Sequence, residues 1–298
     1  MGQHPQLVRN PYGFTPGYTP ITREGDEVGF DFGILRLRAG EVWSGGAGGG
    51  STQSHVIPGE REGALLLMDG AAAFELGARG EGPHLECGPS APDKHGTRVE
   101  RSRSSLFDQD ATVLHFCAGA SVELQAISDC ELAVVRMVNP RRFETRLFDR
   151  DTMAEPSEHR GQGLLDDTSH RIVRTVFDLR NRPESGLVLG EVVTFPGRWS
   201  SYPPHHHPQP EIYHYRFTEP QGFGHGELGQ TVLRVRQFDT VKILDGQDHA
   251  QVAAPGYGMY YLWAIRHLPD NPYSVPEFTE EHRWLNDPAA RFWRPGLS

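Results

Sequence analysis

The amino-acid sequence predicts an all-β protein with two barrel-like or sandwich-like domains. Short apolar stretches are cut by Gly, Pro, Asp and Asn throughout the 298 residues, which include 34 Gly and 23 Pro. No helical hydrophobic period of any length is evident in the first half, and the two halves share the same style of strand-like runs. Many short strands with regular turn signals are typical of barrels and sandwiches.

The first half contains six strand-like runs. Residues 29–41, GFDFGILRLRAGE, predict a strand that ends in an Ala-Gly-Glu turn. Residues 63–76, GALLLMDGAAAFEL, are interpreted as a hairpin with its turn at Asp69-Gly70, because Asp-Gly between apolar runs favours a tight turn. Residues 104–140 predict three further strands at short spacing.

A polar stretch separates the two halves of the chain. Residues 139–170 mix acidic and basic side chains and are interpreted as a linker or arm, so we expect an N-terminal domain over 1–155 and a C-terminal domain over 156–298. The stretch TEEHRWLNDPAARFW predicts a short terminal helix, because a Thr precedes two Glu. Strand-like runs fill the region between these two features: RIVRTVFDL, GLVLGEVVTF, EIYHYRF, QTVLRVRQF, TVKIL and GMYYLWAI.

Charge and hydropathy exclude several classes of partner. The formal net charge is −10, whereas a phosphate backbone selects a basic surface, so nucleic acid is not an expected partner. No apolar run approaches the roughly 18 residues of a membrane span. The first residues lack the basic region and apolar core of a signal peptide, so we expect a cytoplasmic protein without a membrane partner.

The three cysteines form no CxxC pair, which argues against a disulfide framework or a thiolate zinc site. Cys87, Cys117 and Cys130 are interpreted as small hydrophobic residues. Lysine occurs only at positions 94 and 242, so a Schiff-base mechanism has few candidates and is discounted.

Residues 199–217, WSSYPPHHHPQPEIYHYRF, are the strongest functional signal. Alternate side chains of a strand share a face, so His205 and His207 point the same way and His206 points the opposite way. A hairpin at the following Pro-Gln-Pro would bring Glu211 back towards the two histidines. Two His and one carboxylate form a facial set that leaves metal positions open for substrate. The alternative interpretation is an exposed proline-rich loop that happens to be rich in His.

A fourth ligand is expected from a later strand. His249 follows an Asp-Gly turn and precedes a short strand with small residues, whereas the other late histidines lie in turn-like or terminal contexts. His214 lies on the strand face opposite Glu211 and is interpreted as structural. The N-terminal half has isolated histidines and no H-x-H, so we expect metal only in the C-terminal domain; these histidines are His55, His84, His95 and His115.

These motifs resemble the cupin pattern, in which a glycine, H-x-H and a Glu are followed by a second motif with a late His. A closer resemblance is to the 5-deoxyglucuronate isomerase family of inositol catabolism. It is carried by GEVVTFPGRWSSYPPHHHPQPEIYHYRF, PQGFG and VAAPGYGMYYLW. Three further segments are similar to that family: GFDFGILRLRAGE, REGALLLMDG and RGQG…HRIVRTVFD. The resemblance therefore covers most of the chain. LDGQDHAQ stands where that family usually has P-x-G-Y-H-P.

The resemblance implies a bicupin, that is two cupin-type β-barrel (jelly-roll) domains with metal in the C-terminal one. It carries the family's ligand pattern onto His205, His207, Glu211 and His249. It also implies conversion of 5-deoxyglucuronate, an aldehyde, into 5-dehydro-2-deoxygluconate, a ketone. A related uronate ketol-isomerase, acting on a 4-deoxy-hexosulose uronate, is an alternative.

An aldose–ketose conversion moves hydrogen between adjacent carbons and needs polarised oxygens and a proton-transfer group. The ligand set suits Zn, Mn, Fe or Ni, of which Zn and Mn are favoured. The candidates on the predicted metal face for catalysis are Glu211, Tyr213 and Tyr215. The candidates for binding a substrate carboxylate are Arg174, Arg216 and Arg198, together with Lys242.

Two other classes of function stay open on the sequence. A cupin dioxygenase would hold iron and O₂ with the same ligands. A sugar-binding or structural cupin would not turn over a substrate at all. The expected partner is a small sugar acid, and a homo-oligomer is compatible with these features.

Overall fold

The computed structural model of the protein describes residues 4–45, 61–76, 97–120 and 122–296. Within these residues the structure is built almost entirely of strands, so the prediction of an all-β protein is confirmed. The chain forms two compact units. The N-terminal unit comprises Phe14–Pro156 and Thr175–Val188, and the C-terminal unit comprises Met1–Gly13, Ser157–Arg174 and Leu189–Ser298.

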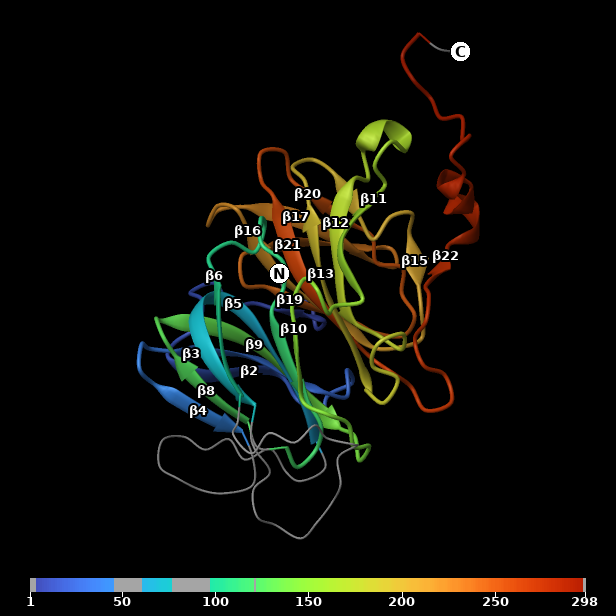
Figure 1. The fold of residues 1–298 in the computed structure, drawn as a ribbon. Helices are drawn as coiled ribbons and strands as arrows, with labels where there is room; N and C mark the ends of the chain where they lie inside the picture. Colours follow the sequence, from blue (N-terminus) through green and yellow to red (C-terminus); the bar gives the residue numbers. More distant parts are fainter. Residues whose placement is uncertain (1–3, 46–60, 77–96, 121, 297–298) are drawn as a thin grey trace. The chain divides into compact units, whose positions relative to one another are not determined.

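The N-terminal unit contains a nine-stranded antiparallel sheet with a bent central strand (Figure 1). Its main path runs β10-β7-β5-β9-β3-β2, while β6 and β8 pair with β5 and β4 pairs with β8. Its strands are β2 (Gly17–Thr22), β3 (Asp31–Leu37), β4 (Val42–Gly45), β5 (Arg61–Leu76), β6 (Thr97–Arg103), β7 (Val113–Phe116), β8 (Val122–Ala126), β9 (Cys130–Val138) and β10 (Arg146–Phe148). β3, β7, β8 and β9 lie where the sequence predicts strands.

The predicted hairpin over residues 63–76 is wrong, because this segment is part of one continuous strand. The β5–β9 register shifts between Leu67 and Asp69, and Gly70 has a φ of +86°. A Cβ at Gly70 would lie 2.1 Å from the carbonyl oxygen of Asp129. Asp69-Gly70 therefore forms a bulge and not a turn. At this bulge β5 bends and passes from one pairing partner to the next.

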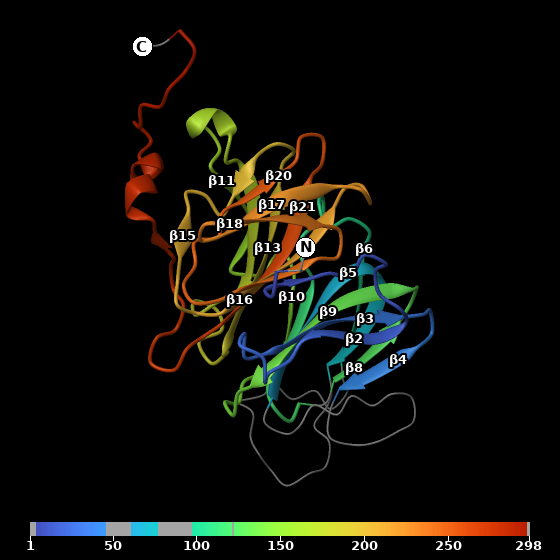
Figure 2. The same ribbon diagram turned by 180° about the vertical axis from the view of Figure 1, so that it is seen from behind.

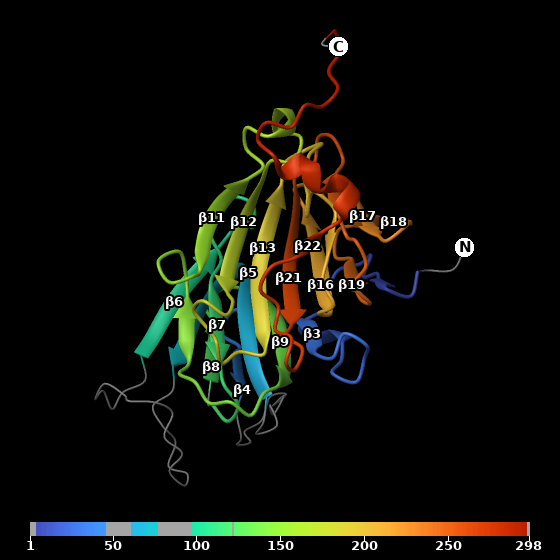
Figure 3. The same cartoon turned by 90° about the vertical axis from the view of Figure 1, so that its right-hand side faces the viewer.

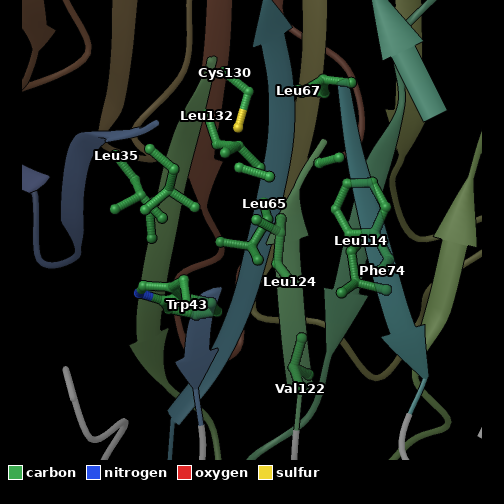
Figure 4. Close-up of a cluster of buried hydrophobic side chains, with 14 of the residues drawn as sticks. Leu35, Trp43, Leu65, Leu67, Phe74, Leu114, Val122, Leu124, Cys130 and Leu132 are labelled. Atoms are coloured by element: carbon green, nitrogen blue, oxygen red, sulfur yellow. The ribbon is translucent and has the colours of Figure 1, made fainter. Parts of the chain in front are cut away.

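The core of the N-terminal unit is a cluster of leucine, aromatic and valine side chains from most of its strands (Figure 4). Leu65 and Leu67 of β5 and Leu132 of β9 are fully buried in it. Cys130 belongs to this cluster, and Cys117 is also buried, which confirms that both act as small hydrophobic residues. Cys87 lies outside the described residues.

The C-terminal unit is built on a seven-stranded and a four-stranded sheet. Figure 3 shows β12, β13, β21, β16 and β19 side by side, and Figure 2 shows β17, β18 and β20. The sheet orders are β1-β19-β16-β21-β13-β12-β11 and β14-β20-β17-β18, and β15 pairs with β22. The elements are β1 (Leu7–Val8), β11 (Glu155–Arg160), η1 (Leu165–Asp167), β12 (Arg171–Phe177), β13 (Leu187–Thr194), β14 (Trp199–Ser200), β15 (His205–His206), β16 (Glu211–Phe217), β17 (Phe223–Leu228), β18 (Thr231–Arg236), β19 (Thr240–Ile243), β20 (Gln251–Ala253), β21 (Met259–Arg266), β22 (Glu277–Phe278) and η2 (Glu280–Asn286).

All six strand-like runs predicted in the second half form strands, and the terminal helix forms as the 3-10 helix η2. The polar stretch 139–170 is not a simple linker, because it supplies β10 and β11 to the two large sheets. The predicted boundary at 155/156 lies beside the division at Pro156–Ser157. Residues 1–13 nevertheless belong to the C-terminal unit, because Leu7 pairs with Val241 of β19.

Alternation along the strands of the seven-stranded sheet gives it two distinct faces. One face contributes apolar and tyrosine side chains to a core that also receives side chains from the four-stranded sheet. This inner face includes Val173, Val192, Tyr213, Tyr215 and Tyr261. The residues between them in sequence point to the opposite, outer face. Within the described residues, no helix combines the length and apolar character needed to cross a membrane.

A buried carboxyl group stands out in the N-terminal unit. Glu62 is fully buried and accepts hydrogen bonds from Asn139 Nδ2 (2.7 Å), Ser185 Oγ (3.1 Å) and the Gly186 N–H (3.0 Å). Its carboxylate lies 3.9 Å from Nε2 of the equally buried His115. Burial lowers the pKa of His115 well below its ordinary value, so this contact is not an ion pair at neutral pH.

Glu62 makes the stability of the protein depend on pH. Burial raises its pKa to about 7, although its hydrogen bonds and Arg182 act in the opposite direction. A carboxyl group whose pKa is higher in the folded than in the unfolded state stabilises the folded protein fully at pH values below its unfolded-state pKa. This stabilisation is lost as the pH rises to the folded-state pKa. Between pH 4.5 and pH 8, the free energy of unfolding of the wild type should therefore fall by up to about 3 kcal/mol more than that of Glu62→Gln.

The test compares unfolding midpoints at pH 5 and pH 8 for wild type and Glu62→Gln. Glu123→Gln, at an exposed position on β8 of the same unit, is the matched control. It should follow the wild-type pH dependence. A Glu62→Gln profile parallel to wild type would contradict this account of Glu62.

Candidate metal centre

The segment that leads into β16 carries the candidate ligands. β15 (His205–His206) pairs with the C-terminal β22 through His205↔Phe278 and His206↔Glu277. The hairpin expected between the histidines and Glu211 is therefore not formed. Glu211 opens β16 and is paired with Ile243 of β19 and Ile265 of β21. The turn over residues 208–210 nevertheless returns the chain, so that Glu211 lies beside His207.

Three of the four expected ligands form one cluster inside the C-terminal unit. His207, Glu211 and His249 are buried, and their ligating atoms lie within 4.8 Å of one another. Glu211 Oε2 is 3.3 Å from His207 Nε2 and 3.5 Å from His249 Nε2. A carboxylate oxygen between two imidazole nitrogens is a donor set that suits a divalent transition metal.

His205 lies next to this cluster. Its ring centroid is 4.7 Å from that of His249, in an edge-on arrangement, and 5.8 Å from that of Phe278. The His207 and His249 rings are 5.2 Å apart. His205 thus lies beside His249, but it is not one of the three residues whose ligating atoms lie within 4.8 Å of one another.

Backbone carbonyl groups orient all three imidazoles in the same way. His205 Nδ1 lies 3.2 Å from the Pro203 oxygen, His207 Nδ1 lies 2.9 Å from the Gln209 oxygen, and His249 Nδ1 lies 2.8 Å from the Gln247 oxygen. A carbonyl can only accept, so each Nδ1 carries a proton, and Nε2 is the ring nitrogen left to face a metal. Such contacts fix the tautomer and ring orientation of metal-binding histidines.

The imidazoles of His205 and His249 are uncharged at neutral pH. Burial, followed by the neighbouring His205, lowers the pKa of His249 to about 3, although Glu211 acts in the opposite direction. Burial also lowers the pKa of His205 to about 4. Neutral imidazole is the form that binds metal, so no proton has to be displaced from these two rings.

Two polar atoms at the centre of the cluster have no hydrogen-bond partner among the described residues. These atoms, Glu211 Oε2 and His249 Nε2, are both buried. Leaving such groups unsatisfied costs about 1–3 kcal/mol each, and more for a charged group. A cation bound between them would satisfy both, so the residues present fit a divalent metal.

The predicted catalytic tyrosines differ in their surroundings. Tyr213 Oη is 3.0 Å from Ser201 Oγ, and its ring centroid lies 5.8 Å from that of His249. Burial, followed by the carboxylate of Glu211, raises the pKa of Tyr213 well above its ordinary value, so it stays a neutral phenol. Tyr215 donates to Gln251 Oε1 (2.7 Å), and Gln251 donates to the His249 carbonyl (2.9 Å). Tyr215 is therefore linked to the cluster by hydrogen bonds through Gln251.

The structure does not bring Arg174 to the cluster. Arg174 lies on the outer face of the seven-stranded sheet, 3% exposed, and its Nη1 is 3.3 Å from Glu191 Oε2. Tyr260 donates to the other oxygen of Glu191 at 2.6 Å. This buried network holds the guanidinium of Arg174 on the face of the sheet opposite that of Glu211.

Arg216, Lys242 and Arg198 are also directed elsewhere. Arg216 contacts Nε2 of His214 and lies over the ring of Phe238, with Cζ 4.5 Å from the centroid. Lys242 is paired across the strands with Ile212, so it shares the outer face instead of the face of Glu211. The Arg198 guanidinium donates to the Asp166 carbonyl (3.3 Å).

His206 and His214 both point away from the cluster, as the strand alternation predicts. His214 is buried on the outer face, with Nδ1 2.8 Å from Thr240 Oγ1. His206 Nδ1 is 2.9 Å from Asp248 Oδ1, which also accepts from Thr279 Oγ1 at 2.7 Å. His206 thus helps to hold the residue that precedes the ligand candidate His249.

Sequence analysis missed three polar residues of the inner face: Arg171, Ser201 and Tyr261. Ser201 Oγ contacts the hydroxyl groups of both Tyr213 (3.0 Å) and Tyr261 (3.1 Å). Tyr261 is the cross-strand partner of Tyr215, so alternation along β21 could have identified it. Arg171 shares a strand face with Val173, which belongs to the inner core, whereas Arg174 does not.

Two strand-rich units, one of which holds a His/Glu cluster among its inner-face side chains, define a two-domain cupin. The chain belongs to the KduI/IolB family, whose sequence profile matches residues 18–285. The predicted family resemblance is thereby confirmed.

Curated relatives carry the name 5-deoxy-glucuronate isomerase. The protein from Geobacillus thermodenitrificans is 31% identical over 173 residues, which span 50% of this chain and 60% of the relative. The protein from Bacillus subtilis strain 168 is 26% identical over 203 residues, 63% of this chain and 69% of the relative. The matched part of the chain thus spans less than two thirds of the length of the first of these relatives.

Solved structures share the fold. An IolB-like protein from Salmonella typhimurium LT2 superposes with a TM-score of 0.74 at 23% identity, covering 95% of this chain and 100% of that one. An oxalate decarboxylase from Lactobacillus farciminis superposes with a TM-score of 0.59 at 11% identity, covering 94% and 90%.

Proposed function

We propose that this protein is a metal-dependent aldose–ketose isomerase that converts 5-deoxy-D-glucuronate into 5-dehydro-2-deoxy-D-gluconate in the breakdown of myo-inositol. The observation that carries the proposal is the pair of buried, unpartnered atoms Glu211 Oε2 and His249 Nε2, which face His207 Nε2. Membership of the KduI/IolB family and the names of the curated relatives support the choice of reaction.

His207, Glu211 and His249 would hold the metal, with His205 as the fourth ligand. A divalent metal bound there would polarise the carbonyl and hydroxyl oxygens of the substrate as a Lewis acid. The negative charge of Glu211 offsets part of the charge of the cation, and the carbonyl contacts at each Nδ1 keep the ligand nitrogens aimed inward.

The remaining inner-face groups serve proton transfer and positioning. Tyr213 keeps its proton on Oη at neutral pH, so it can donate that proton to a substrate oxygen that gains negative charge. Ser201 holds Oη of Tyr213 and Oη of Tyr261 in place. Tyr215 positions His249 through Gln251, without reaching the reacting atoms.

The test is metal analysis of protein purified without added metal, coupled to an isomerase assay. We expect about one divalent metal per chain, loss of turnover on chelation, and recovery on adding Zn²⁺ or Mn²⁺. Turnover that survives complete metal removal would refute the metal dependence. If metal-loaded protein instead turns over only a 4-deoxy-hexosulose uronate, or consumes O₂ with iron bound, the proposed substrate or reaction class is wrong.

A further inference from the structure

Arg171 is held in a fixed orientation at the start of β12. Its Nη1 donates to the Ser169 carbonyl at 2.8 Å, and its Nη2 donates to the Tyr202 carbonyl at 3.1 Å. Tyr202 lies three residues before His205, so one of these bonds ties the guanidinium to the segment that carries the candidate ligands. A guanidinium has five N–H donors, and these two bonds leave others available for a ligand.

Three observations place Arg171 at the inner face with the candidate centre. Its side chain lies on the same strand face as that of Val173, a member of the inner core, because the two residues are two positions apart. Its charge is one of the causes that lower the pKa of His205, after burial and the neighbouring His207. Tyr261 and Tyr213 are two of the groups that act on Arg171 electrostatically. The residue is also only partly buried, unlike Arg174, so solvent and small solutes can approach it.

No ion pair with a described residue neutralises the positive charge of Arg171. In the part of the chain that the structure describes, no carboxylate oxygen lies within ion-pair distance of its guanidinium. Glu158, whose charge acts on it from farther away, is 2.7 Å from Arg160 instead. The nearby tyrosines are uncharged, because burial raises the pKa of Tyr261 to about 12 and that of Tyr213 well above its ordinary value. A fixed, partly desolvated cation without a counter-charge favours an anionic ligand.

We propose that Arg171 forms the carboxylate-binding subsite of the protein, with the hydroxyl groups of Ser201 and Tyr261 beside it. A sugar acid bound there would direct its carbonyl-bearing end towards His207, Glu211 and His249. The identity of the ligand as a sugar acid rests on the proposed function. The subsite would also select for hexuronates over neutral sugars, because a neutral sugar would leave the charge of Arg171 uncompensated.

Binding of D-glucuronate, measured by calorimetry on metal-loaded protein with D-glucose as the neutral comparison, tests this subsite without relying on turnover. Wild type should bind D-glucuronate more tightly than D-glucose. Arg171→Gln should weaken D-glucuronate binding about 10- to 100-fold, the range expected for a lost charge-assisted contact. Its metal content should stay at the wild-type level, because Arg171 is not a ligand candidate.

Arg198→Gln is the matched control, since it makes the same charge change in the same unit and should bind D-glucuronate as wild type does. Arg171→Lys keeps the charge but not the forked geometry, and should weaken binding by at least about threefold. If circular dichroism shows that Arg171→Gln is unfolded, the affinity of Arg171→Lys for D-glucuronate decides whether Arg171 forms the subsite. Wild-type affinity in both Arg171 variants, or no preference of wild type for the acid, would overturn the subsite.

The same variants separate this inference from the proposed function. Wild type that binds D-glucuronate through Arg171 but does not turn over 5-deoxyglucuronate would support the subsite and refute the reaction. Wild type that turns over 5-deoxyglucuronate, with KM unchanged in Arg171→Gln and Arg171→Lys, would support the reaction and refute the subsite.

Discussion

His207→Ala and His249→Ala are each expected to lower metal affinity by at least about 100-fold and to abolish isomerase turnover. Changes to the groups that merely orient a ligand already cost about 10- to 100-fold in metal affinity, and these changes remove a ligand outright. Each variant also leaves Glu211 Oε2 with one imidazole nitrogen fewer nearby. Metal content after dialysis and turnover of 5-deoxyglucuronate, measured side by side, check the expectation. We expect the same loss for His205→Ala.

Glu211→Gln should behave differently from the histidine variants. The amide keeps the shape of the carboxylate but loses the negative charge that offsets the dication, so metal should bind more weakly instead of being absent. Recovery of metal content at raised metal concentration would distinguish this variant from His207→Ala.

Two other histidines serve as controls for this series. His206 points away from the cluster towards Asp248, and His225 is exposed on β17. His206→Ala and His225→Ala should both retain metal. If His206→Ala empties the site while His205→Ala does not, the assignment of inward and outward faces in this segment is off by one residue, and the role of Tyr213 fails with it.

The strands were predictable from the sequence wherever an apolar run ended at a clear turn. TVKIL, for example, is followed by Asp245 and Gly246, both with positive φ, and forms β19. The same dipeptide misled the interpretation of β5, where Asp69-Gly70 lies at a bulge. An Asp-Gly pair indicates that the chain needs a positive φ, and it does not say whether the strand reverses or only bends. That choice is made by the pairing with β9, in which Asp69 lies opposite Glu131, a residue distant in sequence.

The candidate centre was predictable for a related reason. H-x-H followed by Glu places His207 and Glu211 four residues apart, so the short turn over residues 208–210 suffices to bring them together. The arginine for a substrate carboxylate could not be chosen in this way from RIVRTVF alone. Arg171 and Arg174 lie three positions apart and therefore on opposite faces, and only the packing of Val173 shows which face is inside.

Glu191→Ala is expected to destabilise the protein by about 3–5 kcal/mol, the range for breaking a buried ion pair from one side. Arg174 and Glu191 are 3% and 0% exposed, and the carboxylate also accepts from Tyr260 Oη. Alanine removes this acceptor, so the guanidinium of Arg174 loses its counter-charge while it stays buried. Thermal or urea unfolding of the full chain measures the loss.

Two further variants show that burial causes this effect. Glu158→Ala disrupts an exposed pair with Arg160, at 44% and 45% exposure, and should cost no more than about 1 kcal/mol. The double variant Arg174→Met/Glu191→Leu replaces both charges and should be more stable than Glu191→Ala alone. Metal content of this double variant should match wild type, because both side chains lie on the face opposite Glu211. A Glu191→Ala cost no larger than that of Glu158→Ala would contradict the structural role assigned to Arg174, and would return Arg174 to the candidates for substrate binding.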